Sequence, residues 1–221
     1  CEQAMVPWYS GAIGRAWTGK GGVYVVANIR GGGEFGPGWH QAALRQQRQR
    51  SYDDFIAVAE DLVRRGLTTR EHLGISGGSN GGLLVGAVMV QRPELFRAVL
   101  CSVPLLDMKR YHLLLAGASW MAEYGNPDDP NDWAVLSRYS PYQNVKAGVK
   151  MPSVLFTTST RDDRVHPGHA RKMAARMLEQ GHPVLYWENI EGGHGGAADN
   201  GQRARLTALE FGFLWRELAA R

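Results

Sequence analysis

The stretch of residues 77–82 constrains the fold more than any other part of the chain. It reads Gly-Gly-Ser-Asn-Gly-Gly and lies between a short run at residues 72–76 and an apolar run at residues 83–90. This order predicts a strand, a sharp turn and a buried helix. Small residues are needed where strand and helix backbones nearly touch, and glycine neighbours tolerate a strained serine. The turn would lift the Ser79 hydroxyl above the sheet and direct the free N–H groups of the helix N-terminus at a reacting carbonyl group.

The same stretch could also be a glycine-rich cap on an ordinary core helix. The five residues 77–81 fit Gly-x-Ser-x-Gly, a pattern too short to decide between a cap and a nucleophile by itself. Its position between a strand pattern and a helix pattern favours a nucleophilic serine.

Strand and helix patterns alternate along the rest of the chain, which predicts a mainly parallel α/β sheet with helices on both faces. Four further apolar runs have the composition of buried strands, at residues 23–29, 98–103, 152–158 and 184–188. Helices are predicted from Ser51, as N-cap, to Gly66, and over residues 83–90, 166–180 and 206–218. Residues 104–148 are expected to form short helices and loops, and no linker divides residues 1–221, so we expect one domain.

Composition excludes several classes of partner. The net charge of +4 has one local concentration, the arginine cluster at residues 45–50, which lacks interleaved aromatic residues. We interpret it as a solvated connector and expect no nucleic-acid partner. No apolar run approaches membrane-spanning length, so we expect a soluble protein without a membrane partner. Cys1 and Cys101 give neither a disulfide framework nor a metal motif. The compartment stays open, with bacterial cytoplasm and periplasm both compatible.

A nucleophilic serine needs a base, and the base needs an orienting acid. Asp162 and Asp163 follow the predicted strand at residues 152–158, and His194 follows the last one in a glycine-rich loop. Both places lie at the carboxyl edge of a parallel sheet, where the Ser79 turn also opens. Either aspartate could orient the imidazole or cap a helix. His166 and His169 lie near these acids but match no strong metal motif, and we expect no metal.

A dinucleotide cofactor is the rival interpretation of a second glycine-rich loop. Residues 31–36 fit Gly-x-Gly-x-x-Gly, and Asp53 and Asp54 follow about 20 residues later. These acids begin a predicted helix instead of ending a strand. We therefore expect no cofactor and place this loop beside the active site.

With these residues assembled, the chain resembles the catalytic domain of the prolyl oligopeptidase family of serine peptidases over about residues 23–215. Four blocks carry the resemblance, in the same order as in the family: residues 27–34, 77–82, 160–165 and 193–195. The resemblance implies an α/β-hydrolase fold, with Ser79 as nucleophile, Asp162 as acid and His194 as base. It also implies that the Asn80 N–H stabilises the oxyanion, that Arg164 binds a substrate carbonyl, and that Trp120, Tyr124 and Val165 surround the substrate proline.

Phe35 departs from the family, in which a tyrosine hydroxyl at this position is the second oxyanion donor. We expect hydrolysis of short peptides after proline, with an esterase or a peptidase of other specificity as the alternative. The family's β-propeller is not encoded in residues 1–221, and five predicted strands are few for a hydrolase sheet. We therefore expect the C-terminal part of a longer protein whose first strands lie upstream of Cys1. Such a fragment could be catalytically silent, acting only in packing, or could self-associate through its uncovered surface.

Overall fold

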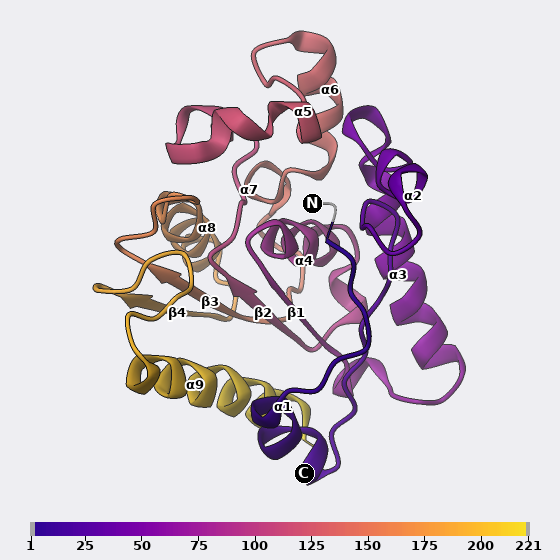
Figure 1. Cartoon of the computed structure of the whole chain (residues 1–221), viewed down its shortest axis with the longest axis vertical. Coiled ribbons are helices and arrows are strands. Elements are labelled where there is room, and N and C mark those ends of the chain that lie inside the picture. Colours follow the sequence, from indigo (N-terminus) through magenta and orange to yellow (C-terminus); the bar gives the residue numbers. More distant parts are fainter. Residues whose placement is uncertain (1–2, 220–221) are drawn as a thin grey trace.

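A four-stranded parallel sheet forms the centre of the computed structural model, which describes residues 3–219 (Figure 1). Cys1, on which the expectation of an upstream segment partly rests, lies outside the described residues. The strands are arranged in sequence order as β1 (Gly74–Gly78), β2 (Ala98–Ser102), β3 (Ser153–Ser159) and β4 (Val184–Asn189). The sequence prediction of these four strands and of their parallel pairing is confirmed.

The strand ends are aligned across the sheet. Gly78 pairs with Ser102, Ser102 with Thr157, and Ser159 with Asn189. Because all four strands are parallel, the turn after β1 and the loops after β3 and β4 leave the sheet at the same edge. The pairing register thereby brings three segments that are far apart in sequence to one place.

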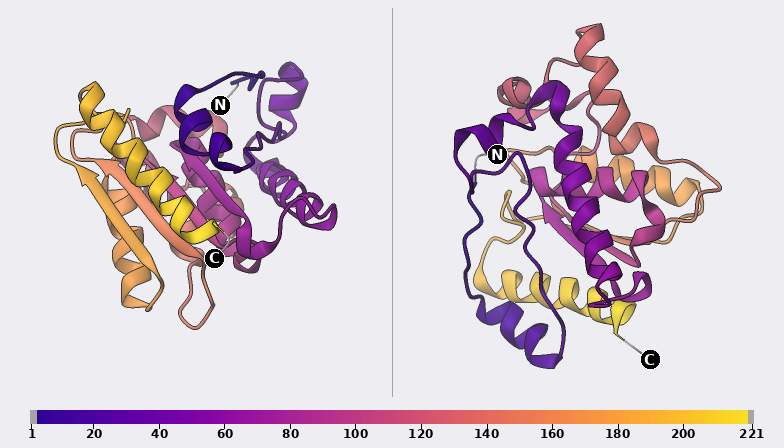
Figure 2. Two further views of the ribbon diagram at one scale, coloured as in Figure 1. Left: turned by 90° about the horizontal axis from the view of Figure 1, so that it is seen from below. Right: turned by 90° about the vertical axis from the view of Figure 1, so that its right-hand side faces the viewer.

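Helices cover both faces of this sheet, as predicted. α4 and α8 pack on one face, and α9 crosses the opposite face (Figures 1 and 2). A large apolar core lies under α4 and α8, and a smaller one joins Leu100 and Leu155 of the sheet to Phe213 and Leu218 of α9. The α-helices are α1 (Gly11–Ala16), α2 (Pro37–Gln41), α3 (Gln49–Arg64), α4 (Asn80–Gln91), α5 (Met121–Tyr124), α6 (Pro130–Tyr139), α7 (Pro141–Asn144), α8 (Gly168–Glu179) and α9 (Asn200–Leu218). Short 3-10 helices lie at Thr18–Lys20, Arg45–Gln47, Arg70–His72, Pro93–Leu95, Tyr111–Leu113 and Leu115–Trp120.

The predicted strand at residues 23–29 is wrong. This segment is extended but belongs to no sheet, and Val23 and Val26 are 74% and 41% exposed. A cavity of about 1090 Å³ separates it from β1, whose outer edge pairs with no strand in the described part of the chain. A strand needs a partner for its N–H and C=O groups, and no described segment supplies one here. Apolar composition alone was therefore not enough to predict a strand at residues 23–29.

The start of α3 also differs from the prediction. The helix begins at Gln49, so Ser51 lies in its first turn and is not the N-cap. The Ser51 hydroxyl instead donates a hydrogen bond of 2.6 Å to the carbonyl oxygen of Arg30. The predicted end is confirmed, because Gly66 follows the helix with a φ of +68°.

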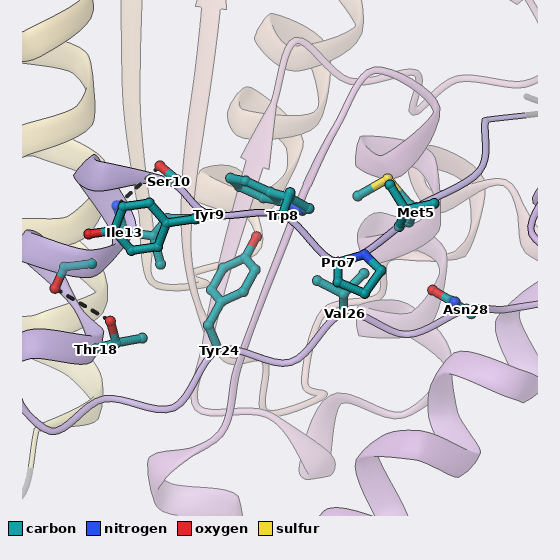
Figure 3. Close-up of a pocket in the computed structure, with 12 residues that line it drawn as sticks. Met5, Pro7, Trp8, Tyr9, Ser10, Ile13, Thr18, Tyr24, Val26 and Asn28 are labelled. Carbon is teal, nitrogen blue, oxygen red and sulfur yellow. Dashed lines mark hydrogen bonds between the residues drawn. The ribbon is translucent and has the colours of Figure 1, made fainter.

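A second cavity, of about 390 Å³, lies within the N-terminal region (Figure 3). Its walls come from residues 5–10, from Ile13, Gly14 and Thr18, and from Tyr24, Val26 and Asn28. Trp8 contacts Tyr24 edge-to-face with ring centroids 6.5 Å apart. None of the predicted catalytic residues lines this cavity. Within residues 3–219, no helix combines the length and the apolar character needed to cross a bilayer.

Candidate active site

Ser79 occupies a strained turn between β1 and α4. Its φ and ψ are +58° and −117°, a backbone conformation that side-chain-bearing residues rarely adopt. The turn is held by the Ser79 N–H, which donates to the carbonyl oxygen of Ser102 at 2.9 Å. Although Ser79 is the N-cap of α4, its hydroxyl makes no capping hydrogen bond. The hydroxyl is thus not used by the helix.

The turn requires glycine at two nearby positions because the surrounding atoms leave no room for a Cβ atom there. A Cβ atom at Gly77 would lie 2.2 Å from the carbonyl oxygen of Gly81, and one at Gly82 would lie 2.5 Å from Cβ of Pro104. The main chains of β1 and α4 therefore touch, as the sequence pattern predicted. We call residues 77–82 the elbow.

His194 and Asp162 meet at the same edge of the sheet, on the loops after β4 and β3. Nδ1 of His194 lies 2.8 Å from Oδ2 and 3.0 Å from Oδ1 of Asp162. Oδ1 of Asp162 also accepts hydrogen bonds of 2.9 Å from the N–H groups of Arg164 and Val165. Burial alone would raise the pKa of Asp162, but the hydrogen bonds from His194 and these two N–H groups outweigh it and hold the pKa below its ordinary value. Asp162 is therefore a buried carboxylate.

Asp163 does not share this position. Its side chain is exposed, whereas that of Asp162 is buried against His194. Residue patterns alone did not decide between the two aspartates, and the structure places them in different environments.

The loop that carries His194 closes tightly on itself. A Cβ atom at Gly192 would lie 2.9 Å from the carbonyl carbon of Gly196. Asn189, at the end of β4, holds both sides of the loop: its Oδ1 accepts from the N–H of Glu191 at 3.0 Å, and its Nδ2 donates to the Gly196 carbonyl at 3.1 Å. Within residues 3–219, no hydrogen bond joins the Ser79 hydroxyl to His194. Sequence reasoning missed Asn189, which looks like an ordinary strand residue.

Asn80 is the first residue of α4 and directly follows Ser79. Its side-chain Oδ1 accepts two hydrogen bonds, from Nη2 of Arg48 at 2.8 Å and from the Tyr124 hydroxyl at 2.5 Å. Arg48 is only 3% exposed and also pairs with Glu123. The interpretation of residues 45–50 as a solvated connector is therefore wrong for Arg48, whose burial had no sequence signal.

The predicted substrate residues have different surroundings. Trp120 is half-buried at the end of the segment that leads into α5, packed against the main core. Arg164 has an exposed side chain, which makes no ion pair within the described part of the chain. Phe35 is 69% exposed and contacts Trp39 edge-to-face.

Tyr124 and Val165, in contrast, are buried, at 3% and 2% exposure. Burial raises the pKa of the Tyr124 hydroxyl, which is occupied by Asn80. Both side chains belong to the main core, from which the Tyr124 hydroxyl donates to Asn80 and the Val165 N–H donates to Asp162. Among residues 3–219, no group of three or more His, Cys, Asp or Glu side chains could hold a metal ion.

Comparisons with known proteins identify the family. The model of the prolyl oligopeptidase family matches residues 8–221. An uncharacterized peptidase, y4nA, of Sinorhizobium fredii is 58% identical over 97% of this chain and 30% of its own length. A prolyl endopeptidase of Dictyostelium discoideum is 40% identical over 89% of this chain and 27% of its own. The solved structure of a post-proline cleaving enzyme from Rickettsia typhi superposes with a TM-score of 0.96 at 43% identity, covering 99% of this chain and 32% of that one.

The chain thus spans about 30% of the length of these relatives. The parallel sheet with its elbow has the α/β-hydrolase fold. The chain belongs to the prolyl oligopeptidase family of serine peptidases.

Proposed function

We propose that Ser79, His194 and Asp162 form the catalytic triad of a serine peptidase that hydrolyses short peptides on the carboxyl side of proline. The hydrogen-bonded pair of His194 and Asp162, at the same sheet edge as the strained Ser79, is the observation that carries this proposal. The names of the relatives support the peptidase class.

The reaction follows from the roles of these groups. The Ser79 hydroxyl attacks the scissile carbonyl carbon while Nε2 of His194 takes its proton, because Nδ1 is engaged with Asp162. The carboxylate stabilises the imidazolium ion that forms. The Asn80 N–H, at the N-terminus of α4, donates to the oxyanion. His194 then protonates the leaving amine. In the second half-reaction Nε2 of His194 takes a proton from a water molecule, which attacks the acyl carbon, and returns this proton to the Ser79 oxygen as the acid product leaves.

Specificity for proline is assigned to Trp120 and Arg164. The pyrrolidine ring is rigid and lacks an N–H, so a flat apolar ring is its natural contact. The exposed Arg164 would hold the carbonyl group before the proline by a charge-assisted hydrogen bond. Phe35 favours one alternative, an esterase or a peptidase of other specificity, because phenylalanine cannot supply the second oxyanion donor.

We further propose that residues 1–221 are the C-terminal α/β-hydrolase part of a longer polypeptide, called here the parent protein. This proposal is supported by the comparison with the relatives, because the chain covers only part of their length. It is also supported by the unpaired edge of β1 and by the apolar wall of the 1090 Å³ cavity beside that edge. Uncovered apolar surface of this kind promotes association, so sedimentation of the isolated chain should show self-association. A monomer at all concentrations would argue against an uncovered face.

The triad is tested with a fluorophosphonate probe, which reacts with activated serines. The parent protein should be labelled at Ser79, and its Ser79→Ala variant should not. An unlabelled parent protein would refute the triad, whereas a labelled parent protein beside an unlabelled isolated chain would support the catalytically silent fragment.

Specificity is tested by Trp120→Ala, with Trp133→Ala as the matched control because both rings are half-buried against the same core. We expect Trp120→Ala to lower kcat/KM for a proline anilide about 10- to 100-fold, the scale of an apolar specificity contact, and to leave a simple ester nearly unchanged. Equal losses on both substrates would make Trp120 structural. Trp133→Ala should affect the two substrates alike.

A further inference from the structure

Arg48 is a buried charge close to the elbow. It is 3% exposed, and burying an unpaired charge is strongly unfavourable. The guanidinium group is matched by Glu123, whose Oε1 accepts from Nη1 at 2.6 Å, and its carbon lies 5.0 Å from the centre of the Tyr124 ring. Burial by itself would lower the pKa of Arg48. The electrostatic effect of Tyr52, Tyr124 and Glu123 is larger and holds this pKa above its ordinary value. Arg48 is therefore a fixed cation in the interior.

The second terminal nitrogen of the guanidinium group is hydrogen-bonded to the side chain of Asn80. Nη2 of Arg48 donates to Oδ1 of Asn80 at 2.8 Å, and the Tyr124 hydroxyl donates to the same oxygen at 2.5 Å. A carbonyl oxygen has two lone pairs, so both are used here. The side chain of Asn80 is held from two directions, one of them by a full charge.

These contacts join segments that are distant in the sequence. Arg48 is the residue before α3, Asn80 begins α4, and Glu123 and Tyr124 lie in α5. Glu123 reaches a fourth segment, because its Oε2 lies 2.9 Å from Nε2 of His40 in α2. α5 directly follows Trp120. One ion pair thus links the elbow to the segment that carries the proposed proline contact.

We infer that Arg48 and Glu123 form a positioning unit that fixes the direction of the Asn80 N–H toward the oxyanion. The inference rests on the proposed function, in which that N–H is the oxyanion donor. Arg48 does not touch the substrate and acts through the Asn80 side chain. A donor fixed before the reaction stabilises the transition state more than the bound substrate, so its loss should lower kcat and leave KM nearly unchanged.

Asn80→Ala in the parent protein tests the direct step. The variant keeps the main-chain N–H but loses the oxygen that Arg48 and Tyr124 hold. Removing an oxyanion donor altogether costs about 10²–10³ in kcat, and a misdirected one should cost at least about 10-fold. KM for a proline anilide should stay within about threefold of wild type, as a rough bound for an interaction absent from the ground state. An unchanged kcat would overturn the inference.

Arg48→Met tests the remote step, with Arg45→Met as the matched control. Arg45 belongs to the same arginine cluster but is half-exposed and pairs with Asp132, without a contact to Asn80. Arg48→Met should lower kcat as Asn80→Ala does, and Arg45→Met should not. In the double variant Arg48→Met/Asn80→Ala the losses should not add, because both remove the same bond. Additive losses would show that Arg48 does not act through Asn80.

Arg48→Lys separates positioning from stability. Lysine can keep the ion pair with Glu123, but its single ammonium group cannot reproduce the fork that reaches Glu123 and Asn80 together. We expect near-wild-type thermal stability with the reduced kcat of Asn80→Ala. A wild-type kcat in Arg48→Lys would overturn the inference, since the charge alone would then suffice. If Arg48→Met does not fold, this variant and Asn80→Ala decide the question.

These experiments distinguish failure of the positioning role from failure of the proposed function. If wild-type parent protein and its Ser79→Ala variant are equally inactive and unlabelled by fluorophosphonate, the proposed function fails and the positioning role falls with it. If the wild type is active and labelled but kcat survives in Asn80→Ala, the positioning role alone is wrong.

Discussion

Adding a single methyl group at Gly77 tests how closely β1 and α4 approach each other at the elbow. The new Cβ atom of Gly77→Ala would lie 2.2 Å from the Gly81 carbonyl oxygen, and such contacts essentially never fall under 3.0 Å. The main chain would have to move by about 0.8 Å, the difference between these two distances. Both sides of the contact are backbone, so neither a rotamer change nor a flexible side chain can relieve it. Overpacking of this kind costs about 1–3 kcal/mol, and we expect the upper end.

Gly212→Ala is the matched control. Gly212 lies in the middle of α9, is exposed, and has open space where a Cβ atom would be. Alanine there should stabilise the helix by about 0.5–1 kcal/mol. For a domain of this size, about 1 kcal/mol shifts Tm by about 2–4 °C, so Gly77→Ala should lower Tm by about 6–12 °C and Gly212→Ala should raise it slightly.

Thermal unfolding followed by circular dichroism measures both shifts, and the rate of fluorophosphonate labelling reports on the elbow. Labelling should be slowed by Gly77→Ala, because the displaced turn misdirects Ser79, and not by Gly212→Ala. A Gly77→Ala protein that melts and reacts like wild type would refute the close approach of strand and helix.

Three further predictions concern the site and its surroundings. Asp162→Asn should lower kcat/KM by about 10⁴, because the amide no longer orients His194, whereas Asp163→Asn, at an exposed position, should stay within about twofold; similar losses in both would contradict the assignment of the acid. Burial lowers the pKa of His169 from 6.5 to about 4, so its contribution to stability, about 3 kcal/mol, is complete above pH 6.5 and is lost as the pH falls toward 4. His169→Asn keeps an acceptor for the N–H groups of Leu106 and Asp107 without titrating, and denaturant unfolding at several pH values should show a flatter profile for it than for wild type. Phe35→Tyr should raise kcat on both a proline anilide and an ester by up to about 10², and no gain would mean that another donor already replaces the hydroxyl.

Local patterns in the sequence were enough to predict the elbow and the edge at which the site forms. A strand followed by small residues and a buried helix has few alternatives, because only glycine allows the approach seen at Gly77. Parallel strands then carry every βα loop to one edge, so Ser79, His194 and one of the two aspartates, Asp162 or Asp163, were expected together from the strand pattern. The family resemblance selected Asp162.

Contacts between distant segments decided what these patterns could not. Residues 23–29 have the composition of a strand, yet they form none, because pairing depends on a neighbour that no local pattern contains. The choice of Asp162 over Asp163 depends on which carboxylate the fold buries against His194, and adjacent acids look alike in sequence.

The burial of Arg48 is the clearest case. In the sequence it is one of several arginines in a polar stretch, and Tyr124 and Glu123 lie some 75 residues away. Only the packing of α5 against the start of α3 brings cation, carboxylate and Asn80 together. The sequence by itself determined where the nucleophile turn and the acid and base loops lie, because short-range sterics and strand order set them. The tertiary structure decided which charges are buried around them, because burial and ion pairing depend on partners far away in the chain.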